Sequence, residues 1–287
     1  MSFGLLTGLG AALAWGTMDI ASALASRRVG SLRVVAGSQI VSAVILIIAA
    51  LVSGTGVPSD PGVNLLAGAM GIVGAGAYLA YFTGLRIGPI SVVSGMVAAY
   101  GGLTVVLAVV LRGETLTTVQ AVGAGFATVG VILTGVAFGG SLRGTRLAGP
   151  GVIFAIAALV LFSVMTIGLA TAIESASWLG VILVSRIVNA TASVVVVLAV
   201  VVRGRSAGGS AGGQTRSLTG SWIWAIVVVA GVLDVLGLIS LAIGLESAPT
   251  WLVGLASSFG RQSRSWWPSR SWVNGSSPSS GLASLAS

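Results

Sequence analysis

The sequence contains no cysteine, no histidine and no lysine, and only 7% of its 287 residues are charged. Without cysteine there is no disulfide framework and no thiolate metal site. Without histidine and lysine, the commonest general acid–base group and the usual Schiff-base amine are also excluded. A soluble domain carries about 25% charged residues, so a chain this poor in charge cannot cover a water-facing surface. The composition therefore predicts an integral membrane protein.

Apolar residues are abundant: they make up 55% of the chain, and the mean hydropathy is +1.07. A helix that crosses a bilayer needs about 20 mostly apolar residues. Runs of that length predict spans at 3–24, 32–52, 63–85, 90–111, 116–138, 150–172, 178–202 and 221–245, and a ninth that begins near Thr250. The connections between them are short, so we expect an all-α fold whose function lies among the helices.

All 14 basic residues are arginines, which stand singly or in small groups between the apolar runs. This placement marks them as topology signals and not as a nucleic-acid surface, so no nucleic-acid partner is expected. The connections after the first, third, fifth and seventh spans carry nine of them, whereas the other side has Arg112. The positive-inside rule then places the amino terminus outside.

Two pairs of segments indicate an internal repeat. "GSQIVSA" at 37–43 resembles "VSRIVNA" at 184–190, which lies 147 residues later, and "GLRIGPISVVSG" at 84–95 resembles "GLESAPTWLVGL" at 244–255, which lies 160 residues later. An insertion in the Gly/Ser-rich segment 204–220 accounts for the difference between the two offsets. Each repeat then holds five spans, and an odd number forces the second copy into the membrane upside down. The alternative is chance similarity between two oily segments.

Several segments carry a resemblance to a known family. They are "ALAWGTMDI" at 12–20, "GLRIGPISVVSGM" at 84–96, "VVLRGETLTTVQAVGAGFATVGVILTG" at 109–135 and, in the second half, "GLESAPTWLVGLASSFG" at 244–260. These resemble the EamA-type ten-helix members of the drug/metabolite transporter superfamily. The Gly-Glu pair followed by Thr, Gln and spaced small residues is the most specific of them.

The resemblance implies two inverted five-helix repeats, which we place at 1–138 and, incomplete, at 150–260. It also implies a secondary-active carrier of small metabolites or drugs that works by alternating access in the cell (plasma) membrane. Its partners would be the lipid bilayer, a small-molecule substrate, and protons or a counter-substrate; a homodimer is compatible with the pattern. The family usually keeps both termini in the cytoplasm, which opposes the arginine pattern and leaves the orientation open.

The last residues, 261–287, break the pattern because they are hydrophilic. The repeat calls for Gly-Glu at 273–274, 160 residues after Gly113-Glu114, but the chain has Val273-Asn274. Read one base out of register, the codons of Trp272 and Val273 necessarily encode Gly at 273. We therefore expect a frame-shifted, non-native tail, which leaves about eight complete helices and a broken ninth of a ten-helix design. A genuine hydrophilic tail is the alternative.

Polar residues inside predicted spans are the candidate site, because a charged group there costs about 2.5–3.5 kcal/mol and needs a partner or a cavity. Trp15 and Asp19 share a helix face, which suits a cation or proton site with an aromatic wall. Alternatively, Asp19 lies near the membrane interface, buffered by Arg27 and Arg28. Tyr78, Tyr81 and Tyr100 offer rings and hydroxyls, either to a cavity or as interfacial anchors and packing. The substrate- or ion-binding candidates are Trp15, Asp19, Gln39, Tyr78, Tyr81, Tyr100, Arg186, Asn189 and Asp234.

Arg186 and Asn189 lie one turn apart, and a pair between Arg186 and Asp234 would neutralise two buried charges. Arg186 either recognises an anionic group of the substrate or forms a structural ion pair. Gln39 occupies its position in the first repeat, so the site would be chemically lopsided. We expect Glu114 to cap the helix that follows it, with a gating role as the alternative.

No phosphate-cradling motif and no cluster of ionisable or metal-binding groups occurs in the sequence. We therefore expect no enzymatic activity, no catalytic residue, no cofactor and no metal. A non-transporting membrane scaffold, or an inactive truncated transporter, is the alternative function.

Overall fold

The computed structural model describes residues 2–88, 90–137, 149–206 and 221–259, and these contain ten helices and no strand. The predicted tail 261–287 lies outside the described residues. The helices are α1 (Ser2–Val29), α2 (Ser31–Ser53), α3 (Pro61–Ile87), α4 (Ile90–Ala98), α5 (Tyr100–Arg112), α6 (Thr118–Ala137), α7 (Pro150–Ile173), α8 (Trp178–Ser206), α9 (Ser221–Ser247) and α10 (Thr250–Ser258). Within the described ranges, seven segments are long and apolar enough to cross a membrane. The expected all-α, multi-pass membrane protein is confirmed.

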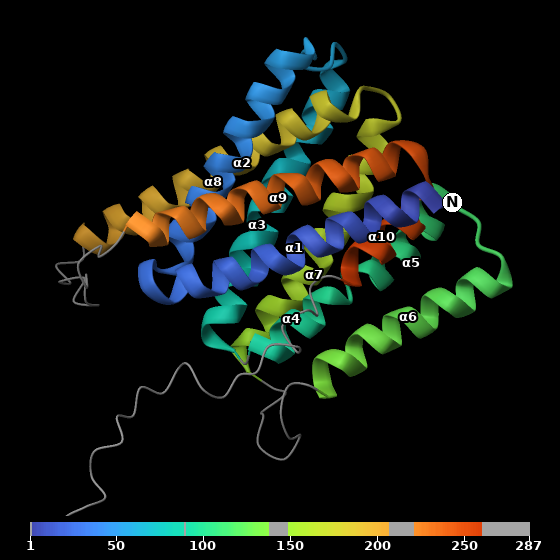
Figure 1. The fold of residues 1–287 in the computed structure, drawn as a ribbon, viewed down its shortest axis with the longest axis horizontal. Helices are drawn as coiled ribbons and strands as arrows, with labels where there is room; N and C mark the ends of the chain where they lie inside the picture. The colour runs from blue at the N-terminus through green and yellow to red at the C-terminus, as the bar shows by residue number, and fades with distance from the viewer. Residues whose placement is uncertain (1, 89, 138–148, 207–220, 260–287) are drawn as a thin grey trace, which may run out of the picture.

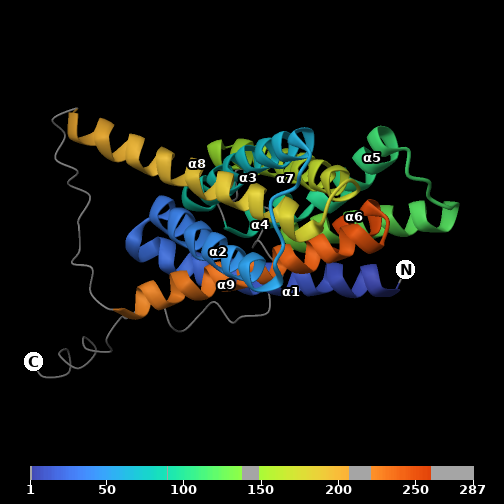
Figure 2. The ribbon, with the colours of Figure 1, turned by 90° about the horizontal axis from the view of Figure 1, so that it is seen from above.

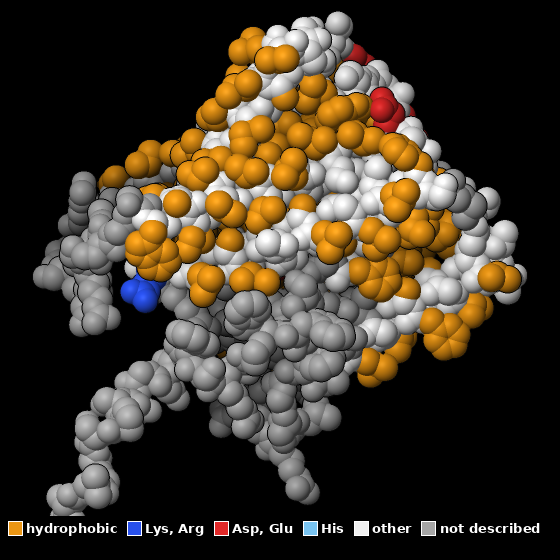
Figure 3. Space-filling view, viewed as in Figure 1, with side chains coloured by type: hydrophobic (Ala, Val, Ile, Leu, Met, Phe, Trp, Pro, Cys, Tyr) orange, Lys and Arg blue, Asp and Glu red, His pale blue; other side chains and the backbone are white. Residues whose placement is uncertain are grey.

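Six long helices form two layers. Figure 2 shows α1, α2 and α9 on one side and α3, α7 and α8 on the other. Within the layers α1 packs along α9 and α3 packs along α7, while α2 and α8 contact each other between the layers. Helix α6 lies at the edge of the bundle and contacts α4 and α5 (Figure 1). Much of the outer surface is apolar, as a surface in contact with lipid must be (Figure 3).

The fourth predicted span is not one continuous helix. It breaks at Ala99, where φ and ψ are −69° and −3° and the amide donates to the carbonyl of Met96 at 3.1 Å. A break of this kind is not readable from an apolar run, which looks the same with or without it. It starts a new helix at Tyr100, whose side chain is 2% exposed in the core.

Two close helix contacts involve residues at equivalent positions of the two halves. Gly71 of α3 packs so closely on α8 that an added Cβ would overlap the carbonyl oxygen of Ser185. Gly231 of α9 packs in the same way on α2, where an added Cβ would lie 2.8 Å from the carbonyl oxygen of Ser38. Gly231 follows Gly71 by 160 residues and Ser185 follows Ser38 by 147. The two contacts are therefore related by the offsets of the sequence repeat.

Charges separate between the two ends of the bundle. We call the end with residue 2 and the connections α2–α3, α5–α6, α7–α8 and α9–α10 the amino-terminal face. It carries Asp60, Glu114, Glu174 and Glu246, with Arg112 among them, whereas Arg28, Arg33 and Arg86 lie at the opposite face. Acidic and basic side chains accordingly appear at opposite ends in Figure 3. The remaining carboxylates, Asp19 and Asp234, lie inside α1 and α9.

Candidate functional site

The centre of the bundle holds a polar network around Asp234 of α9, a residue that is fully buried. Its Oδ2 lies 2.8 Å from Nη1 of Arg186 on α8, so the predicted ion pair is present. Gln39 of α2 donates to the same oxygen at 3.3 Å, and the Tyr78 hydroxyl of α3 donates to Oδ1 at 2.5 Å. Three helices, α2, α3 and α8, thus supply donors to one carboxylate on α9. These donors satisfy a charge that would otherwise be very costly to bury.

Arg186 has further partners in this network. Its Nη1 donates to Oε1 of Gln39, and its guanidinium lies over the Tyr78 ring, 6.0 Å from the centroid, within the range of a cation–π contact. Its Nε is buried and has no hydrogen-bond partner among the described residues. The Nε donor of the guanidinium is therefore not used by the side chains around it.

Asp19 of α1 forms a second polar centre with Tyr81 of α3. The Tyr81 hydroxyl donates to Oδ2 at 2.7 Å, and Asp19 is only 3% exposed. Tyr78, Tyr81 and Tyr100 are buried as well, at most 2% exposed. Their hydroxyls point to polar partners inside the protein.

Phe162 of α7 joins the tyrosines into one aromatic cluster. Its ring meets Tyr78 edge-on at 5.2 Å between centroids and Tyr81 at 6.4 Å, and it lies 6.1 Å from Tyr100. The Tyr100 hydroxyl also lies 2.6 Å from Oγ of Ser257 on α10. Phe162 was not among the sequence candidates, although the repeat could have found it, since it follows Trp15 by 147 residues.

Trp15 and Asn189 each contact a neighbouring helix at a glycine. Trp15 packs on α9, where an added Cβ at Gly237 would lie 2.5 Å from its Nε1. Asn189 approaches α3 at Gly74, and its Oδ1 accepts from Ser193 at 3.5 Å. The structure therefore brings Gln39, Tyr78, Arg186 and Asp234 together and pairs Asp19 with Tyr81. The other three candidates, Trp15, Tyr100 and Asn189, make other buried contacts.

The comparisons with known proteins give one family match and a match of the fold. Residues 2–136 match the model of the EamA-like transporter family. Residues 2–136 are therefore similar to an EamA-like transporter domain. A match to this family suggests a membrane transporter of small molecules, and it fits a protein without enzymatic activity.

A solved structure titled "Crystal structure of protein" has the same fold as this EamA-like chain. It is 21% identical, with a TM-score of 0.70, and the match covers 91% of this chain and 85% of the other. At that identity the match shows a shared fold and nothing more. Because it covers 91% of this chain, the shared fold includes both halves. No curated protein matches the chain.

Glu114, in the most specific motif of the EamA-like domain, does not cap the helix that follows it. Helix α6 has its own capping box, in which the Thr117 amide donates to Oε1 of Gln120 at 2.9 Å and the Gln120 amide donates to Oγ1 of Thr117 at 3.3 Å. Glu114 instead accepts hydrogen bonds from the first amides of α10, Thr250 at 3.1 Å and Trp251 at 3.0 Å. The expectation was wrong about the helix because a sequence shows only which helix is next, not which helix start lies nearby.

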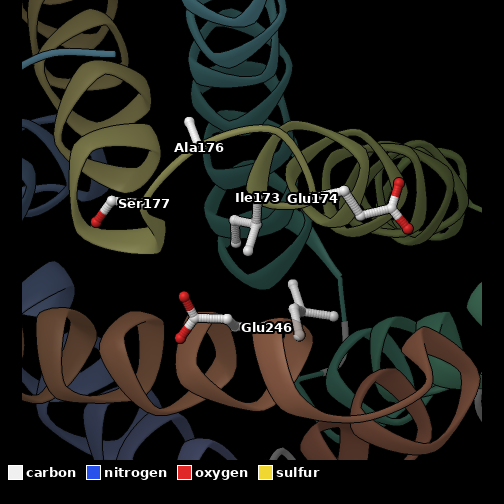
Figure 4. Close-up of a pocket in the computed structure, with 6 residues that line it drawn as sticks. Ile173, Glu174, Ala176, Ser177 and Glu246 are labelled. Atoms are coloured by element: carbon white, nitrogen blue, oxygen red, sulfur yellow. The ribbon is translucent and has the colours of Figure 1, made fainter.

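Two pockets lie away from the polar centre. One of about 500 Å³ opens at the amino-terminal face between the α7–α8 connection and the end of α9, with Glu174 and Glu246 in its lining. Figure 4 shows that the Glu174 side chain points away from Glu246. The other, of about 330 Å³, is an apolar groove between α2 and α8. Neither pocket is lined by a candidate site residue. All nine candidates are buried, with at most 4% of the residue exposed.

Proposed function

We propose that this EamA-like protein is a secondary-active transporter of small metabolites or drugs that works by alternating access. The buried Arg186–Asp234 pair, with Gln39 and Tyr78 bound to the same carboxylate, is the observation that carries the proposal. Charged groups inside membrane helices are rare and mark substrate or ion pathways by default. A scaffold would gain nothing from this arrangement that an apolar core could not supply.

The repeat offers the way such a protein would move. Inverted repeats exchange their conformations, so a cavity that opens to one face in one state opens to the other face in the next. The paired contacts of Gly71 and Gly231, at the repeat offsets, support two halves of like construction. The candidates Trp15, Asp19, Gln39, Tyr78, Tyr81, Tyr100, Arg186, Asn189 and Asp234 would line the cavity once it opens.

Protons or a counter-substrate would drive transport, with Asp19 or Asp234 as the carrier of the proton. Both carboxylates accept a tyrosine hydroxyl, at 2.7 Å and 2.5 Å respectively. Substrate binding that takes the place of one of these tyrosine donors would link the occupancy of the site to that carboxylate, and a secondary transporter needs such a link.

Uptake into proteoliposomes, measured against a panel of metabolites and drugs with and without a pH gradient, tests the proposal. Asp234→Asn and Asp19→Asn should lower uptake or remove its dependence on the pH gradient. Asp60→Asn is the matched control, because Asp60 is exposed, accepts from the Gly62 amide at 2.7 Å, and asparagine caps a helix as well as aspartate does.

The same experiment decides between this function and its alternatives. It is run with the 287-residue chain and with a version whose reading frame is restored after residue 260. Uptake by the restored protein alone would identify the printed chain as an inactive truncated transporter. No uptake by either protein across the panel would favour a non-transporting scaffold, and unchanged pH-dependent uptake in both aspartate variants would remove them as proton carriers.

A further inference from the structure

The turn after α5 carries Glu114 toward the second half of the chain. Gly113 takes a left-handed conformation, with φ of 65°, which glycine adopts without strain. The Glu114 amide then donates to the carbonyl of Ala108 at 3.2 Å. The turn is thus held at the end of α5, and the Glu114 side chain projects from a fixed point.

The carboxylate of Glu114 binds the start of α10. Its two oxygens accept separately from the amides of Thr250 and Trp251, which follow Pro249. The first amides of a helix lack partners within the helix, and the helix dipole favours a negative charge there. Glu114 therefore caps a helix of the second half from a turn of the first half, 136 residues earlier in the chain.

Arg112 extends the contact from α10 to α7. Its Nε donates to Glu114 at 3.1 Å, its Nη1 donates to Oγ1 of Thr171 at 2.8 Å, and its Nη2 lies 2.5 Å from Glu174. The Arg112 and Glu114 side chains are only 14% and 15% exposed. One short turn thus binds two helices of the other half by charged hydrogen bonds, which are stronger than neutral ones.

The helices bound in this way enclose a part of the interior. Ala108 of α5, Ile167 of α7 and Trp251 of α10 form a buried apolar cluster. Farther along α10, Ser257 contacts Tyr100 of the central aromatic cluster. The polar contacts at the face and the contacts in the centre therefore share α10.

We propose that Glu114 is a positioning residue of the transport cycle: it clamps α10 to the first half and holds the amino-terminal face closed. The inference rests on the proposed function, since a face must open and close only in a transporter. If the two halves move apart at this face, the hydrogen bonds from Thr250 and Trp251 to Glu114 break, because donor and acceptor belong to different halves. A neutral side chain at 114 then shifts the population toward the state that is open at this face.

The absence of cysteine from the chain allows a clean test. A single Ala108→Cys, at a fully buried position under the clamp, reports access from the amino-terminal face through its rate of labelling by a small maleimide. A single Ala155→Cys, also fully buried but near the start of α7, reports access from the opposite face. Each reporter is placed in the full chain in nanodiscs, with Glu114 and with Glu114→Gln. Glu246→Gln is the control, since Glu246 is an exposed carboxylate on the same face.

Glu114→Gln should raise the labelling rate of Ala108→Cys about tenfold, because the substitution removes one to two charged hydrogen bonds. The labelling rate of Ala155→Cys should stay the same or fall. A Thr250→Pro variant removes the amide and the hydroxyl of Thr250 at a helix position where proline is tolerated. It should raise the labelling rate of Ala108→Cys less, because the Trp251 amide and Arg112 still bind the carboxylate of Glu114. Glu246→Gln should change neither rate.

A rise at both reporters would mean that Glu114 only stabilises the fold, and no change at either would mean that it holds nothing closed; both results overturn the inference. Labelling needs no substrate, so the test is separate from that of transport. If Glu114→Gln opens Ala108→Cys while the protein moves no substrate, the clamp stands and the proposed function fails. The reverse pair of results would reject the clamp alone.

Discussion

Arg186 donates a hydrogen bond to Gln39, the residue that occupies its position 147 residues earlier in the chain. The two equivalent residues meet in the centre of the bundle, where α2 and α8 contact each other, and both bind the carboxylate of Asp234. One position of the repeat is neutral and the other is charged, and only α9 supplies the counter-charge. The centre is therefore lopsided in chemistry, as the sequence comparison of Gln39 with Arg186 leads one to expect.

The Arg186–Asp234 pair should reveal itself in a double-mutant cycle. Arg186→Met or Asp234→Leu alone leaves one buried charge without its partner and should lower the free energy of unfolding by about 3–5 kcal/mol. The double variant should lose less than either single variant, since no lone charge remains. Thermal unfolding in detergent measures the stabilities, and additive effects would show that the two charges do not depend on each other.

If the double variant is stable, it also separates structure from function. We expect it to fold and to transport nothing, because the polar network is gone. Transport at the parental rate would make the pair purely structural.

The paired close contacts predict that substitutions of Gly71 and of Gly231 lower the stability by similar amounts. Gly71→Ala and Gly231→Ala each force a Cβ against the backbone of a neighbouring helix, and each should lower stability by about 1–3 kcal/mol. Gly125→Ala is the control: an added Cβ there meets nothing within 4 Å, and alanine in a helix is favoured over glycine by about 1 kcal/mol. A large loss at one of the two paired glycines and none at the other would argue against two halves of like construction.

The hydrogen bonds to the carboxylate of Glu114 predict that the protein loses stability in acid. Burial raises the pKa of Glu114, but the hydrogen bonds from Thr250, Trp251 and Arg112 outweigh it and lower the pKa below its ordinary value of 4.5. A carboxylate whose pKa is depressed in the folded state stabilises that state above its ordinary pKa. This stabilisation is lost as the pH falls through the lower, folded-state pKa. Melting temperatures measured between pH 7 and pH 3 should therefore fall less steeply in Glu114→Gln than in the parent, and parallel curves would contradict this.

The frame-shift hypothesis for 261–287 is tested at the level of the gene. Resequencing across codon 260 should reveal a one-base insertion or deletion, and an intact reading frame there would end the hypothesis. Restoring the frame should raise the yield of folded protein, because α10 would continue as an apolar helix and the last span of the expected ten-span design would follow. The restored Gly-Glu at 273–274 should also cap α4, as Glu114 caps α10.

The membrane class, the bounds of the long helices to within about five residues, and the Arg186–Asp234 pair could all be predicted from the sequence. Apolar runs of spanning length have one outcome in a bilayer, since backbone groups there must be satisfied within a helix. A buried arginine and a buried aspartate in a chain with so few charges have few partners to choose from. The division at Ala99 could not be predicted, because the sequence 90–111 is equally apolar on both sides of it.

The sequence by itself determined that this chain folds in a membrane, where its long helices lie, and which side chains must find polar partners there. Only the tertiary structure decided which partners they found: Tyr81 for Asp19, Tyr78 for Asp234, and the start of α10 for Glu114. The physical reason is the separation along the chain of the residues that interact. Helix formation and membrane insertion depend on residues a few positions apart, whereas these contacts join residues 62, 156 and 136 positions apart and exist only once the helices have packed.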